Sequence, residues 1–463
     1  MQYFFFIWIV KGIMIYKRRG NKQKDDIVYM KKERERNIIM KEKSSMIILP
    51  EEDEDIEFDA VLSRLSDWHE EIKLGEIVER ENEDSTLSYD IPLCIDERDY
   101  TVTISQADVE VPELFRAVHA FSDLDFERVE NAKRGLVVEM DYSDHFLTSY
   151  HDQLKIMDVM VPNQLAVMDV PSEKIISGKW VKTAAESEVP PAPRYLFTVQ
   201  AVSGDSDEVW LHTHGLKRCG LPELEIMGSN KEMFNTHYSI IEAMATRMIE
   251  KEKALQACEP MFLAWLTEDI ALVTTIIHWK DALKYYPNAE LGNAEGRDDY
   301  HSKDTYVIML YKEPEDVETQ KITQVQAYDE YLGENTMFLV SDEETDRMRR
   351  MAQERIDYVK KVMNNTELDV HVLLKIGLQI DKEFRDPETD PSLQKEHIWF
   401  ELKEIKKQLF KEVFVCELTQ KPYYVKKMDV GSIGKYTVSD ITDWLIFIDG
   451  NRYTSDDVYL LED

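Results

Sequence analysis

The pattern of apolar residues is the feature that most constrains the fold of this chain. Short apolar runs typical of strands alternate with stretches whose apolar residues recur every three or four positions, as on one face of a helix. No unit of roughly 20 to 50 residues repeats along the 463 positions, which excludes solenoids and propellers. The alternation predicts an α+β fold in which mixed sheets are covered by helices.

Strands and helices alternate in the part of the chain before about residue 337. Phe58, Val61 and Leu65 have helical spacing and follow an acidic run, which predicts a helix with acidic residues at its start. Ser229 and Glu232 have the spacing of a capping box, which predicts that a further helix begins there and runs to about residue 257. Other patterns predict a strand at 136–140, a helix at 146–160, a hairpin across 195–213 and a strand at 305–311.

The last part of the chain has a mostly β pattern. Ser341 and Glu344 form a second capping pattern, which predicts a helix to about residue 363. Apolar residues then alternate along 372–380, and Asp449 followed by Gly450 is a strong hairpin signal. We therefore expect a helix followed by a small antiparallel sheet, twisted or closed into a barrel.

Composition and proline positions divide the chain into four parts. The prolines within 190–193 form the clearest rigid break. The predicted parts are an extension outside the fold at 1–45, α+β domains at 46–190 and 191–337, and a C-terminal domain at 338–463.

The first 45 residues differ from the rest in charge. They carry 12 Lys or Arg and 5 Asp or Glu, whereas the other 418 residues carry 44 basic and 86 acidic side chains. The apolar run from Tyr3 to Tyr16 is interrupted by Lys11 and is shorter than the roughly 20 residues that span a bilayer. We expect a dispensable extension; the alternatives are a short membrane anchor or an interfacial helix. In each case the body is predicted to lie in the cytoplasm, with membrane contact only if residues 1–45 act as an anchor.

The overall charge restricts the partners. The chain has 91 acidic against 56 basic residues, a net charge of −35. Such a surface repels phosphate backbones, so no nucleic acid is expected. It favours a basic protein partner instead. The four cysteines are too scattered for a disulfide framework, which favours a reducing compartment.

Motifs for nucleotide binding and for nucleophilic catalysis are absent from the sequence. It contains no GxxxxGK[ST], GxGxxG or GxSxG pattern. Lys217 and Arg218 lie beside Cys219 and would lower the pKa of its thiol, but no paired histidine is evident. We therefore expect no cofactor and lean towards a protein that is not an enzyme.

One histidine pattern supports an alternative. On a strand, His212 and His214 would project from the same face, as two metal ligands do, and His237 could supply a third ligand. This predicts a divalent transition metal, and with it a metal-dependent hydrolase. The competing interpretation is a structural or partner-facing motif that also includes Gly215, Glu223 and Glu225.

The C-terminal part resembles the bacterial domain-of-unknown-function family 2314. The segments that carry this resemblance are 396–401, 421–425, 439–444 and 451–454. Within them, Asp443 and Trp444 are expected to be structural or to form part of an interaction motif: the indole fills the core, and the carboxylate caps a turn or accepts from a backbone amide.

The preceding part, from Met46 to about residue 335, resembles family 4026. The resemblance rests on the segment 46–50 with the acidic run that follows it, and on 215–225, which is also similar to family 4261. None of these families implies an activity or a catalytic residue. The leading hypothesis is thus a non-catalytic, cytosolic bacterial protein that binds or regulates another protein.

Overall fold

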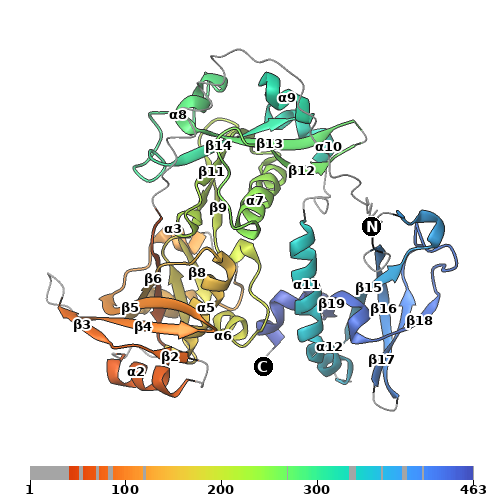
Figure 1. Cartoon of the computed structure of the whole chain (residues 1–463), viewed down its shortest axis with the longest axis horizontal. Coiled ribbons are helices and arrows are strands. Elements are labelled where there is room, and N and C mark those ends of the chain that lie inside the picture. The colour runs from red at the N-terminus through yellow and green to blue at the C-terminus, as the bar shows by residue number, and fades with distance from the viewer. Residues whose placement is uncertain are drawn as a thin grey trace. The chain divides into compact units, whose positions relative to one another are not determined.

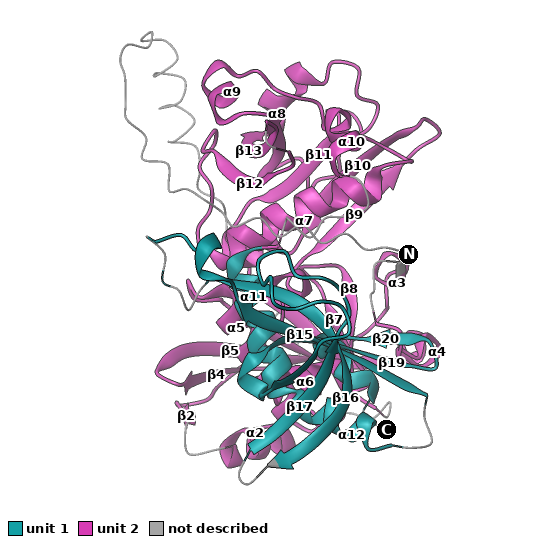
Figure 2. Cartoon of the chain, turned by 90° about the vertical axis from the view of Figure 1, so that its right-hand side faces the viewer, with its two compact units in different colours: residues 1–13, 187–190, 341–463 teal, residues 14–186, 191–340 magenta. Residues whose placement is uncertain are grey.

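The computed structural model describes two compact units (Figure 2). Within the described residues, the larger unit comprises 41–186 and 191–340, and the smaller unit comprises 187–190 and 341–463. Of the extension predicted at 1–45, residues 1–40 lie outside the described part of the chain. Its boundary at residue 45 is wrong, because Ser44 and Ser45 begin strand β1, Ser44–Leu49, and Ser44 is fully buried. In the described part, no helix is long and apolar enough to cross a membrane. The described residues are 41–51, 56–68, 72–81, 87–117, 121–267, 269–332, 340–365, 369–387, 390, 394–408 and 411–461.

The larger unit begins with an antiparallel sheet, in which eight strands are described (Figure 1). Seven of them have the order β2-β4-β5-β6-β1-β7-β8, and β3 pairs with β4. The first described strand therefore lies inside the sheet, where Met46 is opposite Val138 on one side and Asp169 on the other. The strands are β1 Ser44–Leu49, β2 Ile72–Leu74, β3 Val78–Glu81, β4 Leu87–Ile95, β5 Arg98–Asp108, β6 Arg134–Met140, β7 Ala166–Asp169 and β8 Lys174–Ser177.

Helices accompany this sheet. The predicted helical spacing near residue 58 is confirmed, because Val61 and Leu65 are the buried residues of α2. The helix predicted at 146–160 is also confirmed as α5, which packs against α2 and α6. The helices are α2 Phe58–Asp67, α3 Glu113–Ala117, α4 Phe126–Asn131, α5 Phe146–Met160 and α6 Gly178–Ala185.

A second sheet completes the larger unit, with the order β12-β13-β14-β11-β10-β9. Its neighbouring strands are antiparallel except β11 and β14, which are parallel. The predicted hairpin is confirmed by the pairing of β9 with β10, and the predicted strand at 305–311 is β14. The elements are β9 Thr198–Ser203, β10 Glu208–His214, β11 Glu223–Asn230, α7 Phe234–Glu250, β12 Met261–Trp265, β13 Ala271–His278, α8 Trp279–Ala282, β14 Thr305–Tyr311, α9 Pro314–Thr319 and α10 Asp329–Leu332.

The capping box predicted at Ser229 is wrong. Ser229 is still paired with Val209 in the ladder between β10 and β11, so the strand continues through it and the helix begins only at Phe234. Its hydroxyl contacts the ring of His237 on α7. Because Ser229 is paired with Val209, the side chains of both residues lie on the face of the sheet that α7 covers. Trp210 follows Val209 on the same strand and therefore points to the opposite face.

A buried ion pair joins the two sheets of the larger unit. Arg218, just after β10, donates from Nη1 and Nη2 to both oxygens of Asp169 on β7, at 2.9 and 2.8 Å. Both side chains are 0% exposed. The guanidinium also donates to the Leu196 carbonyl, and its carbon lies 5.9 and 5.5 Å from the ring centres of Tyr142 and Tyr150. The arginine thus finds charged, polar and aromatic partners away from water.

The smaller unit is an open antiparallel sheet with two helices. Its strand order β18-β17-β16-β15-β19-β20 leaves two edges, so of the two predicted alternatives the structure has the sheet and not the barrel. The α+β class predicted for the whole chain is confirmed. The elements are α11 Asp342–Glu354, α12 Ile356–Met363, β15 Val370–Gln379, β16 Lys395–Gln408, β17 Lys411–Leu418, β18 Ile433–Tyr436, β19 Ile441–Ile448 and β20 Asn451–Tyr453.

Local signals in this unit were reliable. The Ser341 side chain accepts a hydrogen bond from the backbone N–H of Glu344 at 3.0 Å, which confirms the predicted cap. The helix is interrupted at Arg355, between α11 and α12. The Asp449–Gly450 turn joins β19 to β20, and both residues have the positive φ that this two-residue turn requires.

Asp443 and Trp444 lie on β19. The Trp444 ring is fully buried and donates from Nε1 to the carbonyl of Ala352 at 3.0 Å, which ties the sheet to α11. One oxygen of Asp443 accepts from the backbone N–H of Trp444 at 2.8 Å. Burial raises the pKa of Asp443 to about 6. Both residues therefore have structural contacts inside this unit.

We expect Arg218→Met to destabilise the larger unit by about 3–5 kcal/mol, because it leaves the Asp169 carboxylate buried without its partner. Urea unfolding of the variant and the parent measures this difference. Arg116→Ala is the control, since it removes an exposed ion pair with Glu130 and should cost less than about 1 kcal/mol. A loss below about 1 kcal/mol for Arg218→Met would show that the pair does not hold the sheets together.

We expect Asp443→Asn to change how the stability of the smaller unit depends on pH. Because the folded pKa is raised, the folded state binds the proton more tightly, so stability falls as the pH rises from the unfolded value of about 4 through 6. The amide avoids this loss, and the variant should gain about 1–3 kcal/mol over the parent at pH 7 but little at pH 4. Urea unfolding at both pH values measures the difference, and a gain independent of pH would contradict it.

Candidate metal centre

The site is built on the end of strand β10. Trp210, His212 and His214 alternate along it and therefore share one face, opposite to the face covered by α7. On the neighbouring strand β11, Glu225 is the direct register partner of His212. The predicted strand and its period of two thus place both histidines side by side on a buried surface.

A third histidine comes from the loop before β14. The ring centre of His301 lies 4.2 Å from that of His212 and 4.7 Å from that of His214, and the last two are 5.2 Å apart. The exposed fractions are 3% for His212, 3% for His214 and 1% for His301. Three imidazoles therefore meet in a space from which water is almost excluded.

Each of these rings has a nitrogen without a hydrogen-bond partner. The buried, unpartnered atoms are Nδ1 of His212, Nε2 of His214 and Nε2 of His301. One nitrogen from each ring lies within 4.8 Å of those from the other two. Buried polar atoms almost always have partners, so three unpartnered nitrogens in one cluster call for a ligand between them.

The opposite nitrogen of His301 is held by a carboxylate, and that of His214 lies near one. Nδ1 of His301 contacts Asp298 at 2.9 Å, and Nδ1 of His214 lies 3.5 Å from Glu173 in the turn between β7 and β8. A carboxylate on one ring nitrogen keeps the proton there and leaves the lone pair on the other nitrogen free. This is the arrangement that orients histidine ligands in metal sites.

The rings of His212 and His214 are held in the neutral form that binds metals. Burial, followed by the neighbouring His301 and His214, lowers the pKa of His212 well below its ordinary value. Burial and then His301 lower the pKa of His214 to about 3. Neutral imidazole is the ligand form, so no proton has to leave these two rings before an ion binds.

An ion pair fixes the loop that carries His301. Arg297 donates from Nη1 and Nη2 to the two oxygens of Glu225, both at 2.6 Å, and both side chains are 0% exposed. Its guanidinium carbon lies 5.4 Å from the ring centre of Trp210 and 4.2 Å from that of Trp279. This bidentate pair, stacked against two indoles, holds the loop against β10 and β11.

Glu223 supports the other side of the cluster. One of its oxygens accepts from Tyr300, which precedes His301, at 2.9 Å and from the backbone N–H of Gly215 at 3.0 Å. The other oxygen accepts from Thr213 at 2.7 Å. Gly215 has a φ of +108°, and a Cβ there would lie 2.8 Å from the Leu196 carbonyl, so glycine is required at this turn.

His237, predicted as a third ligand, lies elsewhere. Its Nδ1 contacts the Ser229 hydroxyl at 2.7 Å and its Nε2 contacts Asp329 at 2.8 Å. It sits on α7, on the opposite face of the sheet from His212, so the sheet separates it from the cluster. Ser229, His237 and Asp329 are hydrogen-bonded in series, as in a catalytic triad, but Ser229 is only 2% exposed and His237 is 0% exposed, so a substrate does not reach them.

We interpret this series of hydrogen bonds as a structural link between β11, α7 and α10.

No sequence pattern identifies His301 as a ligand. It lies far along the chain from His214, in a polar loop that has no periodic pattern, and Arg297 brings it to the site. The lowered pKa expected for the Cys219 thiol is not found, because burial outweighs the nearby cations and raises this pKa to about 12. The pair formed by Lys217 and Arg218 serves other contacts, with Tyr300 and Asp169.

The donor set fits a first-row transition metal. Three imidazoles suit zinc, copper, nickel or iron, and in the described residues no carboxylate or thiol joins the cluster. Two nitrogens bound to a tetrahedral zinc ion at its usual bond length are about 3.3 Å apart. Small ring rotations would therefore close the cluster around an ion, with one coordination position left for a further ligand.

Two family matches cover most of the larger unit. Residues 44–191 match the N-terminal part, and residues 199–309 the C-terminal part, of a family described as "Protein of unknown function (DUF4026)". No curated protein and no solved structure matches the chain. The predicted resemblance to family 4026 is confirmed, whereas those to families 2314 and 4261 stay predictions. All three clustered histidines lie in the second matched range.

We expect Arg297→Met to release the loop at 287–304. The variant leaves the Glu225 carboxylate buried and unpaired, which should lower the free energy of unfolding by about 3–5 kcal/mol. The loop backbone should then become accessible to a protease. Limited digestion with a protease of broad specificity, followed by mass spectrometry, should show faster cleavage within this loop. Lys303→Met is the matched control, because its side chain is exposed on the same loop and its loss should leave the cleavage rate unchanged.

Proposed function

The chain belongs to the DUF4026 family, and we propose that it is a metal-binding protein whose centre is formed by His212, His214 and His301. The observation that carries the proposal is that three buried imidazoles each have a nitrogen without a partner, and that each ring brings one nitrogen within 4.8 Å of those of the other two. A buried polar atom without a partner costs about 1–3 kcal/mol, so three together are destabilising until a ligand fills the space. A transition metal ion supplies one partner to all three.

The proposed ion has a structural or regulatory role. Catalytic zinc sites keep a coordination position that substrate can reach. Here the three rings are at most 3% exposed, and the loop anchored by Arg297 covers them. An ion in this position would link β10 to the loop through His301, and loss of the ion would remove one of the contacts that hold the loop in place. The proposal therefore favours a non-catalytic metal site over the hydrolase predicted from His212 and His214.

The predicted protein-binding role is compatible with this proposal. The support for a basic partner is the net charge of −35, which would attract such a partner over long range. A metal-held loop on an acidic body suits a regulatory module, because ion occupancy would change one part of its surface. The location in the cytoplasm stays a prediction.

We expect one transition metal ion per chain in protein purified without a histidine tag. Mass spectrometry of the dialysed protein for zinc, nickel, copper and iron measures the content. His212→Ala, His214→Ala and His301→Ala should each lose the ion, because two imidazoles do not make a stable site. In the parent, free ion at a hundred times its dissociation constant should raise the unfolding free energy by about 2.7 kcal/mol.

Two histidine variants serve as controls. His145→Gln changes a side chain that is 65% exposed, and His237→Gln changes the residue on the opposite face of the sheet; both should retain the ion. Ion content unaffected by the three alanine variants would refute the site. Ester hydrolysis that requires the ion and disappears with His212→Ala would favour the hydrolase over the structural role.

A further inference from the structure

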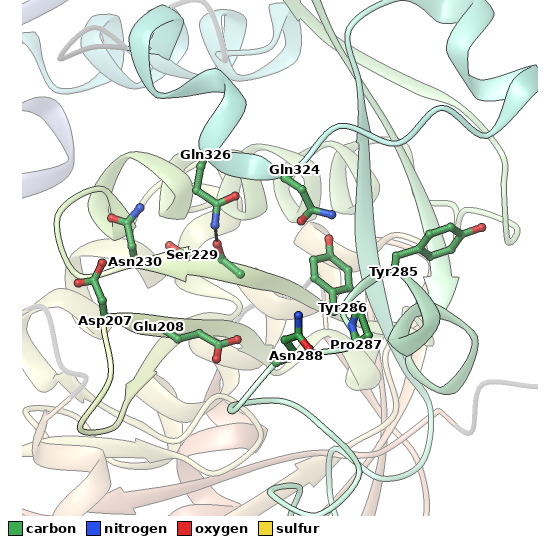
Figure 3. A pocket seen from close by; sticks show the side chains of 12 residues that line it. Asp207, Glu208, Ser229, Asn230, Tyr285, Tyr286, Pro287, Asn288, Gln324 and Gln326 are labelled. Atoms are coloured by element: carbon green, nitrogen blue, oxygen red, sulfur yellow. Dashed lines mark hydrogen bonds between the residues drawn. The ribbon is translucent and has the colours of Figure 1, made fainter.

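A second feature of the same sheet face lies at the opposite end of β10. A shallow, open cavity of about 480 Å³ lies there (Figure 3). Asp207 and Glu208 at the start of β10 line one end, and Tyr286 and Gln324 line another part of its wall (Figure 3). The cavity lies wholly within the larger unit.

The lining has one sign of charge. Asp207 and Glu208 contribute carboxylates, and among the described residues that line the cavity none is Lys, Arg or His. Asn288, Gln324 and Gln326 add amide oxygens that can accept hydrogen bonds. Such a lining repels phosphate and carboxylate ligands, and it attracts groups that are positively charged and donate hydrogen bonds.

The acidic end of the cavity is fixed in place. Oε2 of Glu208 accepts from the backbone N–H groups of Glu290 and Leu291 at 2.7 and 3.3 Å, so its carboxylate is held by the loop that follows Tyr286. Neither contact neutralises the charge, because backbone amides are uncharged. The carboxylate is therefore positioned before any ligand arrives, which lowers the entropic cost of binding.

Tyr286 offers the cavity an aromatic ring and a hydroxyl. Among the described residues this hydroxyl has no hydrogen-bond partner, and Figure 3 shows it directed towards Gln324. The adjacent Tyr285 already has an ammonium over its ring, since Nζ of Lys284 lies 4.8 Å from the ring centre. A cation is attracted to the face of a tyrosine ring, so the Tyr286 ring can take the same kind of group from a ligand.

We propose that this cavity binds a small organic cation that carries primary ammonium groups, through the carboxylates of Asp207 and Glu208 and the ring of Tyr286. One ammonium group pairs with the carboxylates, and a second lies near the tyrosine ring and the amide oxygens. Ser229 takes no part, although it borders the cavity, because its side chain lies on the face of β11 that contacts His237. The proposal does not depend on the metal centre.

Titration calorimetry of the full chain with spermidine tests this proposal. The parent should bind one spermidine per chain, and the double variant Asp207→Asn with Glu208→Gln should bind it at least about tenfold more weakly, because both charge-assisted contacts are lost. Glutamine at 208 keeps an oxygen for the N–H groups of Glu290 and Leu291, so the fold should be retained. Circular dichroism and the unfolding midpoint check this.

The acidic body requires a control for non-specific attraction. The double variant Glu290→Gln with Glu295→Gln removes the same charge from exposed positions on the neighbouring loop and should change the affinity less than about twofold. If both double variants weaken the affinity for spermidine equally, spermidine is attracted by the overall negative charge of the protein and not by this cavity, and the proposal is overturned. Absence of binding to the parent, or binding of glucose instead of spermidine, would overturn it as well.

Discussion

The ion pair between Glu225 and Arg297 determines where the loop over β10 lies. Glu225 is fixed by its place in a central strand, and its two oxygens match the guanidinium fork. Breaking such a pair inside the protein is costly, so the loop has one strongly favoured position. That position places His301 against His212 and the first residues of the loop beside Glu208. Both candidate sites of the larger unit therefore depend on one buried interaction.

Elements with strong local signals were predictable from the sequence. Helix α5, strand β14 and the cap at Ser341 depend on nearby residues, and the structure has them where their patterns predicted. Ser229 shows the limit of such signals. It has the same spacing to a glutamate as Ser341 has, but it is paired with Val209 in the ladder between β10 and β11 and therefore does not cap a helix. Whether the last sheet closes depends on its edge strands, which local patterns do not specify.

The candidate centre was predictable only in part, for the same reason. The period of two along β10 is local, and it places His212 and His214 together. His237 was expected beside them because it is near in sequence, but the sheet lies between α7 and the cluster. His301 depends on a long-range pair between Arg297 and Glu225, and neither residue has a pattern that identifies its partner. Spacing alone therefore yields two ligands and not the third.

The contrast between carboxylates and imidazoles on this face is the strongest argument for a ligand. Glu223 and Glu225 are fully buried, and every one of their four oxygens accepts at least one hydrogen bond. The fold thus satisfies groups that are expensive to bury, even where this requires a glycine turn and an arginine from a distant loop. The neighbouring imidazoles are equally buried, yet each has a nitrogen without a partner. A fold that satisfies the carboxylates so completely leaves these nitrogens for a ligand that is not part of the chain.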